Sequence, residues 1–348
     1  MIMGFEFLLV GEPVFPRQLE SSDERFPSPP TSAQFAVDLR RRVDRVETLQ
    51  EALRFEYISI LAALREMGPE FRIVYGHPED VDKTTLGMAL SLGCRLAGVG
   101  PDFFPGGTIY PRDLAMRAGK VNLINSGWTR LLRSSVELIA SPFGEGGRTL
   151  ATGNTILVGE RIIEHEGKSR WVNPDDLAPL HAAGLQVGIL PLPVAVFCTM
   201  EGVTDRVFFN DHWDRYACLV TGRDGGKHLI LDPCVMTAAW VDVERKSWAL
   251  VNPADSEKVI RTVCEPLGVT VHRLPGLEVP YALNLIQLAD GRILMTGGDD
   301  IARGVLEELV GTNQVFTTEA PICHYPVFAQ AGIRCLVSEA PPVFKRRV

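Results

Sequence analysis

The sequence predicts an α/β protein in which one unit, a β-hairpin followed by a helix and a strand, is repeated along the chain. Two observations predict this unit. Apolar or alternating runs flank Gly, Asn or Asp turns in four hairpin-like segments, at 113–125, 148–159, 216–232 and 281–295. Helical apolar spacing at 175–183, 256–267 and 301–309 is followed each time by an extended apolar segment, at 186–192, 270–274 and 332–338.

The repeats also predict how the chain is organised as a whole. No copy of so small a unit can bury its own apolar face, so neighbouring copies must pack on one another. A linear array would leave its terminal sheets exposed, and the sequence shows no capping repeat at either end. We therefore expect a closed, circular arrangement of the repeats within one domain that spans 1–348.

The N-terminal part shows the same alternation of strands and helices. A strand is expected at 5–11, and we expect it to share a sheet with a segment from elsewhere in the chain. A polar, proline-rich loop or lid follows at 12–33, and 32–67 has the apolar spacing of one or two helices. A strand at 71–75 and an amphipathic helix at 81–92 come next.

Composition limits the class of partner. The chain has 348 residues, of which 46% are hydrophobic and 22% charged, and its formal net charge of -8 argues against a nucleic-acid-binding protein. Seven cysteines without a CxxC pair predict a reduced, cytoplasmic chain, and no apolar run is long enough to span a membrane. We expect a small-molecule partner, no metal and no cofactor, and the oligomeric state stays open.

Four short motifs bring together residues that could perform nucleophilic catalysis. A thiol needs a nearby base to be a useful nucleophile at neutral pH, and the chain offers a cysteine, a histidine and several carboxylates. The motifs are Arg112-Asp113, Glu145-Gly146-Gly147, Asp211-His212-Trp213-Asp214 and Gly332-Ile333-Arg334-Cys335.

Each motif also has a structural interpretation. Cys335 alone is better explained as a small buried hydrophobic residue at the start of a strand, and Arg112-Asp113 as a surface ion pair. The glycines after Glu145 alone predict a loop that needs positive φ angles. For His212 the functional interpretation is favoured, because flanking aspartates concentrate charge with no packing purpose, although His324 remains a rival base.

Taken in order, the four motifs resemble those of the guanidine-modifying pentein superfamily, over about 111–342. That superfamily includes arginine deiminases, agmatine deiminases, dimethylarginine dimethylaminohydrolases and amidinotransferases. The resemblance implies a five-bladed α/β propeller of ββαβ units around a central site. The unit predicted from the residues is compatible with that fold.

The resemblance also implies a role for each candidate residue. Cys335 would be the nucleophile, His212 the general acid and base, and Glu145 the carboxylate that orients the imidazole. Asp113 and Asp214 would bind the guanidinium. Substrate-binding arginines are Arg112 and, for a substrate carboxylate, Arg161. The chain departs from the family pattern at Arg148, where many members have Asp or Asn, and at Ala331, where others have Gly.

The chemistry requires these residue types. A guanidinium is planar and cationic, so two carboxylates can hold its nitrogens and leave the central carbon facing a thiolate. The expected activity is hydrolysis of the guanidino group of arginine or a related compound through a covalent thiouronium. The alternatives are an amidinotransferase with the same Cys/His site and, in another class, a non-catalytic binding protein with this fold.

Overall fold

A computed structural model describes the part of the chain that forms the repeats. The described residues are 8–15, 49–76, 78–98, 111–113, 115–125, 138–143, 146–163, 169–191, 193–200, 203–210, 212–233, 235, 237–242, 247–251, 256–279, 281–319, 321–322 and 332–339. Most of the predicted 12–33 lid, 32–48, Glu145 and His324 therefore lie outside the described residues. Among the described helices, none is long and apolar enough to cross a membrane.

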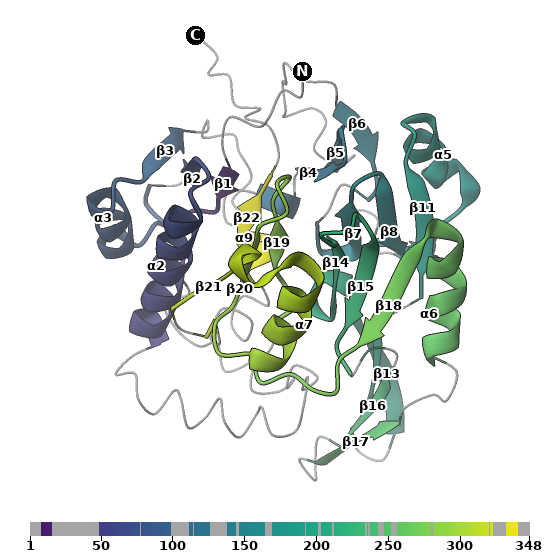
Figure 1. The fold of residues 1–348 in the computed structure, drawn as a ribbon. Helices are drawn as coiled ribbons and strands as arrows, with labels where there is room; N and C mark the ends of the chain where they lie inside the picture. Colours follow the sequence, from purple (N-terminus) through teal and green to yellow (C-terminus); the bar gives the residue numbers. More distant parts are fainter. Residues whose placement is uncertain are drawn as a thin grey trace.

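Four units contain a hairpin whose second strand pairs in parallel with a third strand (Figure 1). The second unit comprises β4 (Ala115–Ala118), β5 (Val121–Asn125) and β6 (Leu138–Ser141). The third comprises β7 (Thr149–Thr152), β8 (Thr155–Gly159), α5 (Pro174–Ala182) and β11 (Gln186–Leu190). The fourth comprises β14 (Ala217–Thr221), β15 (Lys227–Leu231), α6 (Ser256–Cys264), η7 (Glu265–Leu267) and β18 (Val269–Arg273). The fifth comprises β19 (Ile286–Gln287), β20 (Ile293–Met295), α7 (Asp300–Val310), η8 (Thr312–Gln314) and β21 (Val315–Thr317). All four predicted hairpins are thus confirmed.

The first unit joins the two ends of the described chain. Its elements are β1 (Leu8–Val10), α2 (Leu49–Met67), β2 (Phe71–Tyr75), α3 (Lys83–Ser91), β3 (Arg95–Gly98) and, from the C-terminal end, β22 (Val337–Ser338). Leu9 pairs antiparallel with Ser338, and Val10 with Val337. The prediction that the N-terminal strand shares a sheet with a distant segment is confirmed.

The strand predicted at 332–338 is only partly correct. Gly332 is followed by a short helix, α9 (Ile333–Leu336), and only Val337–Ser338 is a strand. A short apolar run satisfies a helical turn as well as a strand, so periodicity could not separate the two. The parallel strand that completes the fifth unit is instead β21, which directly follows α7 and η8.

Two sheets interrupt the repeats and were not predicted. Strands β9 (Arg161–Ile163) and β10 (Ser169–Trp171) form a hairpin between β8 and α5. A four-stranded sheet comprises β12 (Val194–Met200), β13 (Val203–Asn210), β16 (Thr237–Asp242) and β17 (Ser247–Val251). Strands β12 and β13 form an insertion before β14, and β16 and β17 form a second insertion between β15 and α6. Both insertions lengthen the fourth unit.

Neighbouring units share their hydrophobic cores. Buried residues of the second and third units form one cluster, those of the third and fourth another, and those of the fourth and fifth a third. A further cluster joins α2 of the first unit to β20 of the fifth and to α9, through Leu64, Leu294 and Leu336. No described unit is therefore packed on its own.

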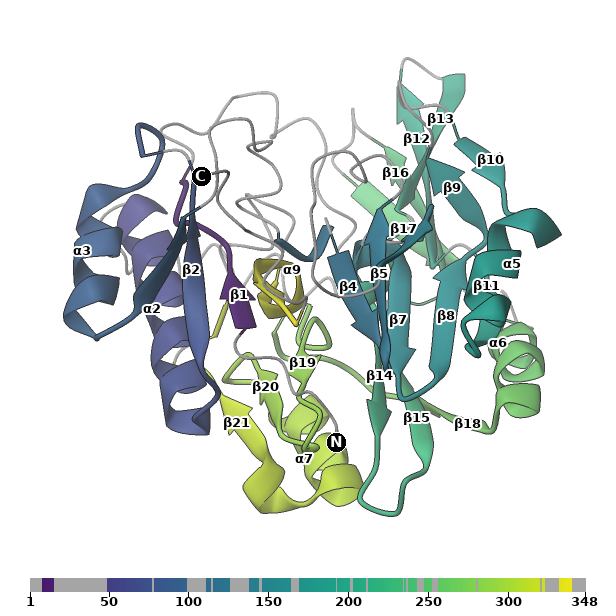
Figure 2. The ribbon, with the colours of Figure 1, turned by 90° about the horizontal axis from the view of Figure 1, so that it is seen from above.

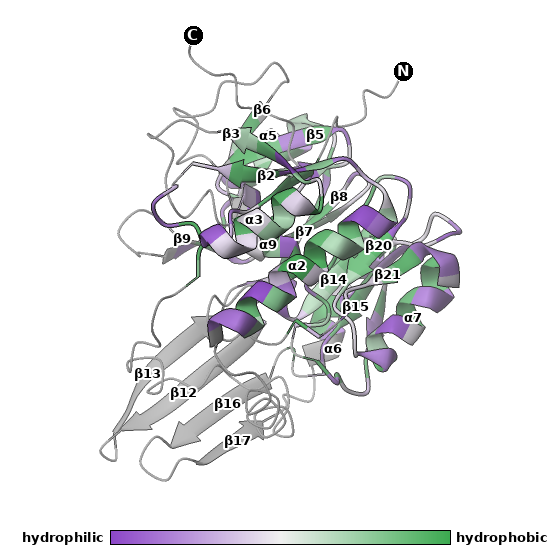
Figure 3. Cartoon of the chain, turned by 90° about the vertical axis from the view of Figure 1, so that its left-hand side faces the viewer, coloured by the Kyte–Doolittle hydropathy of each residue, from purple (hydrophilic) through white to green (hydrophobic). Residues whose placement is uncertain are grey.

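Helices α2, α3, α5, α6 and α7 lie outside the strands, whereas α9 lies near the middle of the molecule (Figure 2), and α7 carries hydrophilic residues on its outward side (Figure 3). In α7, Ala302, Leu306 and Val310 are buried at a spacing of four residues, while Arg303 is exposed. This spacing places the apolar residues on one face of the helix. The capping side chain of α7 is Asp299, which accepts a hydrogen bond from the Ala302 amide at 2.8 Å.

Candidate active site

Cys335 lies at the junction of α9 and β22, where it contacts one of the predicted carboxylates. Its side chain is 6% exposed. The Sγ atom donates a hydrogen bond to Asp214 Oδ2 across 3.3 Å, although the two residues are far apart in the sequence. The interpretation of Cys335 as a small buried hydrophobic residue requires apolar surroundings. The contact with Asp214 shows that its surroundings are partly polar.

Asp214 is held in a fully buried position by the short helix η6 (Trp213–Arg215). The neighbouring Trp213 is also fully buried and donates from Nε1 to the Pro191 carbonyl at 2.9 Å. While Oδ2 accepts from Cys335, Oδ1 of Asp214 is buried with no hydrogen-bond partner among the described residues. A buried carboxylate oxygen without a donor is costly, which makes it a place where a cationic ligand would be stabilised.

His212 immediately precedes η6 and lies against the glycines of η4 (Gly146–Arg148). A Cβ atom at Gly147 would lie 2.2 Å from His212 Nδ1. Neither Gly146 nor Gly147 is among the glycines with positive φ, so the prediction that these glycines serve a left-handed turn is wrong. Gly147 is required because the imidazole approaches its backbone too closely for any side chain.

Arg112 belongs to η2 (Pro111–Asp113) and is 3% exposed, so its interpretation as part of a surface ion pair is wrong. A Cβ atom at Gly146 would lie 2.4 Å from its Cγ atom, which shows that the arginine side chain crosses that glycine. The side chain of Asp113 and the whole of Glu145 lie outside the described residues.

The four motifs converge on one region although they come from four parts of the chain. The short helix η2 contacts η4 and α9, η4 contacts η6 and α9, and η2 also contacts β4 and β22. In the view of Figure 2, α9 lies near the middle of the molecule between β1 and β4. The structure therefore brings Arg112, His212, Asp214 and Cys335 together.

A second buried arginine, Arg334, stands next to the cysteine. Its Nη2 atom donates to the Thr149 carbonyl at 2.9 Å, which joins α9 to the start of β7. Burial, with the like charge of Arg112, lowers the pKa of Arg334 to about 10, although Asp214 acts in the opposite direction. Arg334 thus lies close enough to both Arg112 and Asp214 for their charges to shift its pKa. Arg148, the departure from the family pattern, is also buried.

Arg161 lies apart from the four motifs, on the β9–β10 hairpin. It lies at the start of β9, and its guanidinium stacks over the Trp171 ring at 5.5 Å from the centroid. Trp171 is 63% exposed. The contact thus lies at the surface of the β9–β10 hairpin rather than among the four converging turns.

Asn284 was missed by the sequence analysis. It is 2% exposed and donates from Nδ2 to the Asp214 carbonyl at 3.0 Å and to Cys335 Sγ at 3.5 Å. A single asparagine before an apolar strand has no recognisable spacing to other motifs, so no sequence signal identifies it. The buried amide becomes visible only when its partners are known.

Two other cysteines, Cys218 and Cys264, are fully buried in the hydrophobic clusters. Burial raises the pKa of Cys218 and that of Cys264 to about 12, so both remain protonated thiols at neutral pH. Cys323 lies outside the described residues. Among the residues that the structure describes, no group of three or more His, Cys, Asp or Glu side chains could hold a metal ion.

A scan of protein-family models finds no match to the chain, and a search of curated protein sequences finds none either. The solved structures that resemble the chain include a dimethylarginine dimethylaminohydrolase, an arginine dihydrolase and an amidinotransferase. Dimethylarginine dimethylaminohydrolase from Pseudomonas aeruginosa, solved with citrulline, is 14% identical with a TM-score of 0.44, over 97% of this chain and 99% of that one. The N-terminal domain of ArgZ, an arginine dihydrolase from cyanobacteria, solved with its substrate, is 15% identical with a TM-score of 0.41, over 75% and 86%. SxtG, an amidinotransferase from Microseira wollei, is 11% identical with a TM-score of 0.41, over 99% and 97%. At TM-scores of 0.44 and below, these similarities carry no argument about the activity of this chain.

Proposed function

We propose that this protein hydrolyses the guanidino group of arginine or a related compound through a covalent thiouronium at Cys335. One observation carries the proposal: Cys335 Sγ lies 3.3 Å from a buried carboxylate, Asp214. The other oxygen of that carboxylate has no donor among the described residues. A guanidinium bound there would satisfy this oxygen and bring its central carbon next to the sulfur.

The reaction has two halves that use the same imidazole. Asp214 and Asp113 hold the guanidinium, the Cys335 thiol passes its proton to His212, and the sulfur forms a bond to the central carbon to give a tetrahedral adduct. His212 protonates the departing nitrogen as the C–N bond breaks. Water then attacks the thiouronium carbon while His212 removes its proton, and the C–S bond breaks. Glu145 is proposed to orient the imidazole, and Arg112 to bind the rest of the substrate.

The proposed fold is a single domain, 1–348, in which the five units close into a five-bladed propeller. Three observations support closure. Each consecutive pair of units from the second to the fifth shares a core, and the fifth shares one with the first. The first unit contains the C-terminal strand β22. The remaining pair is joined by η2, which precedes β4 and contacts α9 and β22.

The test is turnover and adduct formation with arginine, agmatine, methylated arginines and guanidino acids. We expect ammonia or an amine to be released and the quenched protein to carry a thiouronium at Cys335. Cys335→Ser should lose nearly all turnover but still bind the substrate, because a serine hydroxyl ionises far less readily than a thiol. Asp214→Ala should weaken binding first, because the buried cation would lose a partner.

Cys94→Ser is the matched control, because Cys94 is a partly buried thiol that precedes β3 in the first unit. It should retain wild-type turnover. Full activity of Cys335→Ser, with no adduct from any guanidine, would exclude nucleophilic catalysis by this residue. Transfer of the amidino group to an added amine in place of water would instead support the amidinotransferase alternative.

A further inference from the structure

The side chain of Asn284 contacts both Cys335 and the main chain of Asp214. Its Oδ1 atom accepts from the Arg334 backbone amide at 2.8 Å, and its Nδ2 atom donates to the Asp214 carbonyl at 3.0 Å. The second Nδ2 hydrogen faces Cys335 Sγ, with the two heavy atoms 3.5 Å apart. The amide therefore links the turn that carries the cysteine to the turn that carries the aspartate.

The orientation of this amide is fixed by its partners. A backbone N–H can only donate, so the group that faces Arg334 must be the side-chain oxygen. A backbone carbonyl can only accept, so the group that faces Asp214 must be the side-chain nitrogen. A flipped amide would lose both hydrogen bonds in a site where Asn284 is 2% exposed. The sulfur consequently faces an N–H donor and not an oxygen.

The backbone around Asn284 is built to hold it there. Its amide donates to the Tyr281 carbonyl at 2.8 Å, closing a turn in which Tyr281 has a φ of 50°. Tyr281 is the one non-glycine residue with positive φ in the described part of the chain. An aromatic residue in this conformation is strained, and such strain persists only where the surroundings enforce it. Here the ring packs on Tyr216 at 6.2 Å and under Arg215 at 6.0 Å.

Gly332 shows the same constraint from the opposite side. Its φ of -118° is accessible to any residue, so a left-handed turn does not explain the glycine. A Cβ atom there would lie 2.5 Å from Asn284 Oδ1. The glycine is therefore required because the amide of Asn284 approaches the backbone at the start of α9.

We propose that Asn284 positions Cys335 and supplies a fixed N–H donor that stabilises its thiolate. This inference rests on the proposed function, in which that thiolate is the nucleophile. A hydrogen bond to the charged form of a group favours that form. The negative charge of the Asp214 carboxylate disfavours a thiolate at Cys335. The Asn284 N–H offsets this repulsion by donating to the sulfur. When a substrate cation engages Asp214, the sulfur passes its proton to His212, the base of the proposed function, and the Asn284 N–H still faces the thiolate.

The experiment measures thiolate formation without any substrate. Alkylation of Cys335 by iodoacetamide is followed by mass spectrometry of its peptide as a function of pH. In Asn284→Ala, we expect the midpoint of this profile to rise by about one pH unit, and the rate at neutral pH to fall about tenfold. Asn284→Asp, which replaces the donor by a carboxylate of the same shape, should raise the midpoint further.

Gln287→Glu is the matched control. Gln287 also uses both ends of its amide, accepting from the Thr221 amide and donating to the Thr221 carbonyl, each at 2.8 Å. The same amide-to-carboxylate exchange there should lower stability but leave the alkylation profile unchanged. A purely structural role for Asn284 predicts the same outcome at both positions.

Each result decides the inference separately from the proposed function. A raised midpoint supports the role of Asn284 even if no guanidino compound is turned over. An unchanged midpoint in folded Asn284→Ala would overturn the role, even if Cys335 forms the expected adduct with a substrate. Failure of Asn284→Ala, Asn284→Ser and Asn284→Asp all to fold, judged by circular dichroism, would also overturn it, because the amide would then be a folding requirement.

Discussion

At the scale of single residues, the candidate site depends on glycines that leave room for other side chains. Gly146, Gly147 and Gly332 all have ordinary φ angles, and each is crossed by a polar side chain: Arg112, His212 and Asn284, respectively. Unlike many glycines in turns, these three cannot be replaced by a larger residue without a clash. Adding one methyl group to any of them must displace a residue of the site.

Gly147→Ala is expected to abolish turnover while leaving most of the stability. The new Cβ atom would lie 2.2 Å from His212 Nδ1, so the imidazole must move away from its place in the site. A misplacement of about 1 Å can cost on the order of a hundredfold in rate. Turnover is measured on the substrate found by screening, and the unfolding midpoint by circular dichroism.

Gly304→Ala is the control for that substitution. Gly304 lies in α7 with nothing within 4 Å of a Cβ position, so alanine should stabilise the helix by about 1 kcal/mol and leave turnover unchanged. Equal activity of Gly147→Ala and the wild type would show that His212 is not needed where the structure places it.

Residue-scale prediction from the sequence succeeded where chemistry needs a charged or nucleophilic side chain. Cys335 and Asp214 were singled out by residue type, and the structure places them in contact. Asn284 could not be found in this way, because its function is defined entirely by partners from other parts of the chain. Arg112 was misjudged because a sequence does not show that a glycine will cover a guanidinium.

At the scale of elements, local sequence rules predicted hairpins better than the segments inserted between them. Turn residues such as Gly153 and Gly225 adopt positive φ between paired strands, as their chemistry requires. The α9 helix was mistaken for a strand because a run of four residues does not establish a period. The sheet containing β12 and β16 was missed because its strands pair across two separate insertions.

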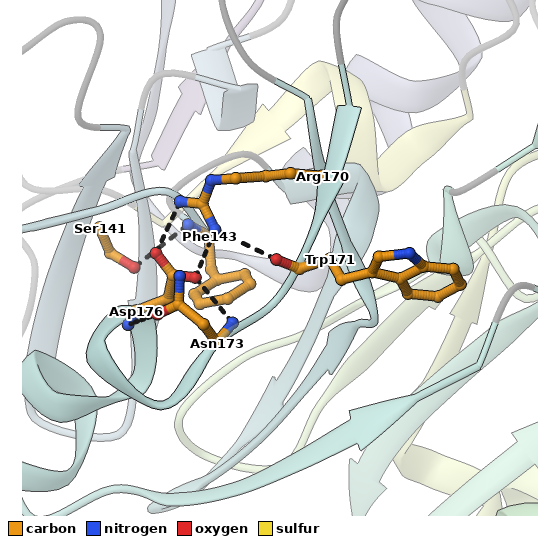
Figure 4. Close-up of polar contacts among 6 residues, drawn as sticks. All are labelled: Ser141, Phe143, Arg170, Trp171, Asn173 and Asp176. Carbon is orange, nitrogen blue, oxygen red and sulfur yellow. Dashed lines mark hydrogen bonds and ion pairs between the residues drawn. The ribbon is translucent and has the colours of Figure 1, made fainter.

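The N-terminus of helix α5 is held by a group of polar contacts whose contribution to stability can be tested (Figure 4). Asn173 and Asp176 form a capping box, and Arg170 of β10 binds both oxygens of Asp176, at 2.6 and 2.7 Å. The hydrogen bond from Arg170 is the main cause that lowers the pKa of Asp176 below its usual value. A carboxyl group with a depressed pKa stabilises the folded state above its unfolded pKa and loses that contribution as pH falls.

Arg170→Gln should therefore lower the free energy of unfolding by about 1 kcal/mol at neutral pH. The difference from the wild type should shrink as pH falls below about 4, because Asp176 is protonated first in the unfolded state and, through its lowered pKa, only at more acidic pH in the folded state. Urea denaturation at a series of pH values measures this difference in the free energy of unfolding. Arg303→Gln removes an exposed pair with Glu307 and should cost only a few tenths of a kcal/mol. If the free-energy difference between Arg170→Gln and the wild type did not change with pH, the Arg170 contact would not be what lowers the pKa of Asp176.

At the scale of the whole molecule, the two ends of the described chain meet beside the candidate nucleophile. Strand β22 begins two residues after Cys335 and pairs with β1, and the Gly11 amide donates to the Leu336 carbonyl at 2.8 Å. The position of the sulfur therefore depends on the N-terminal strand. Repetition in the sequence predicted that neighbouring units pack on one another, but it did not identify the side chains that form each shared core.

Shared cores predict that all units unfold together. Leu64 on α2 is fully buried in the cluster that joins the first unit to the fifth, whereas Trp213 is fully buried in the cluster of the third and fourth units. Leu64→Ala should cost about 2–5 kcal/mol, because it removes buried methyl groups and leaves a cavity. If the units form one cooperative domain, Trp213 should report this loss although it lies in another cluster.

The measurement uses protein labelled with fluorotryptophan, in which fluorine NMR follows the Trp213 resonance and circular dichroism follows the whole chain. In urea, we expect both signals to give one coincident transition, and Leu64→Ala to move both midpoints down equally. Exposed Phe55 on the same helix supplies the control: it is 54% exposed, so Phe55→Ala should move neither midpoint appreciably. A Trp213 transition that stays in place while the circular dichroism midpoint falls would divide the chain into independent domains and overturn the single-domain proposal.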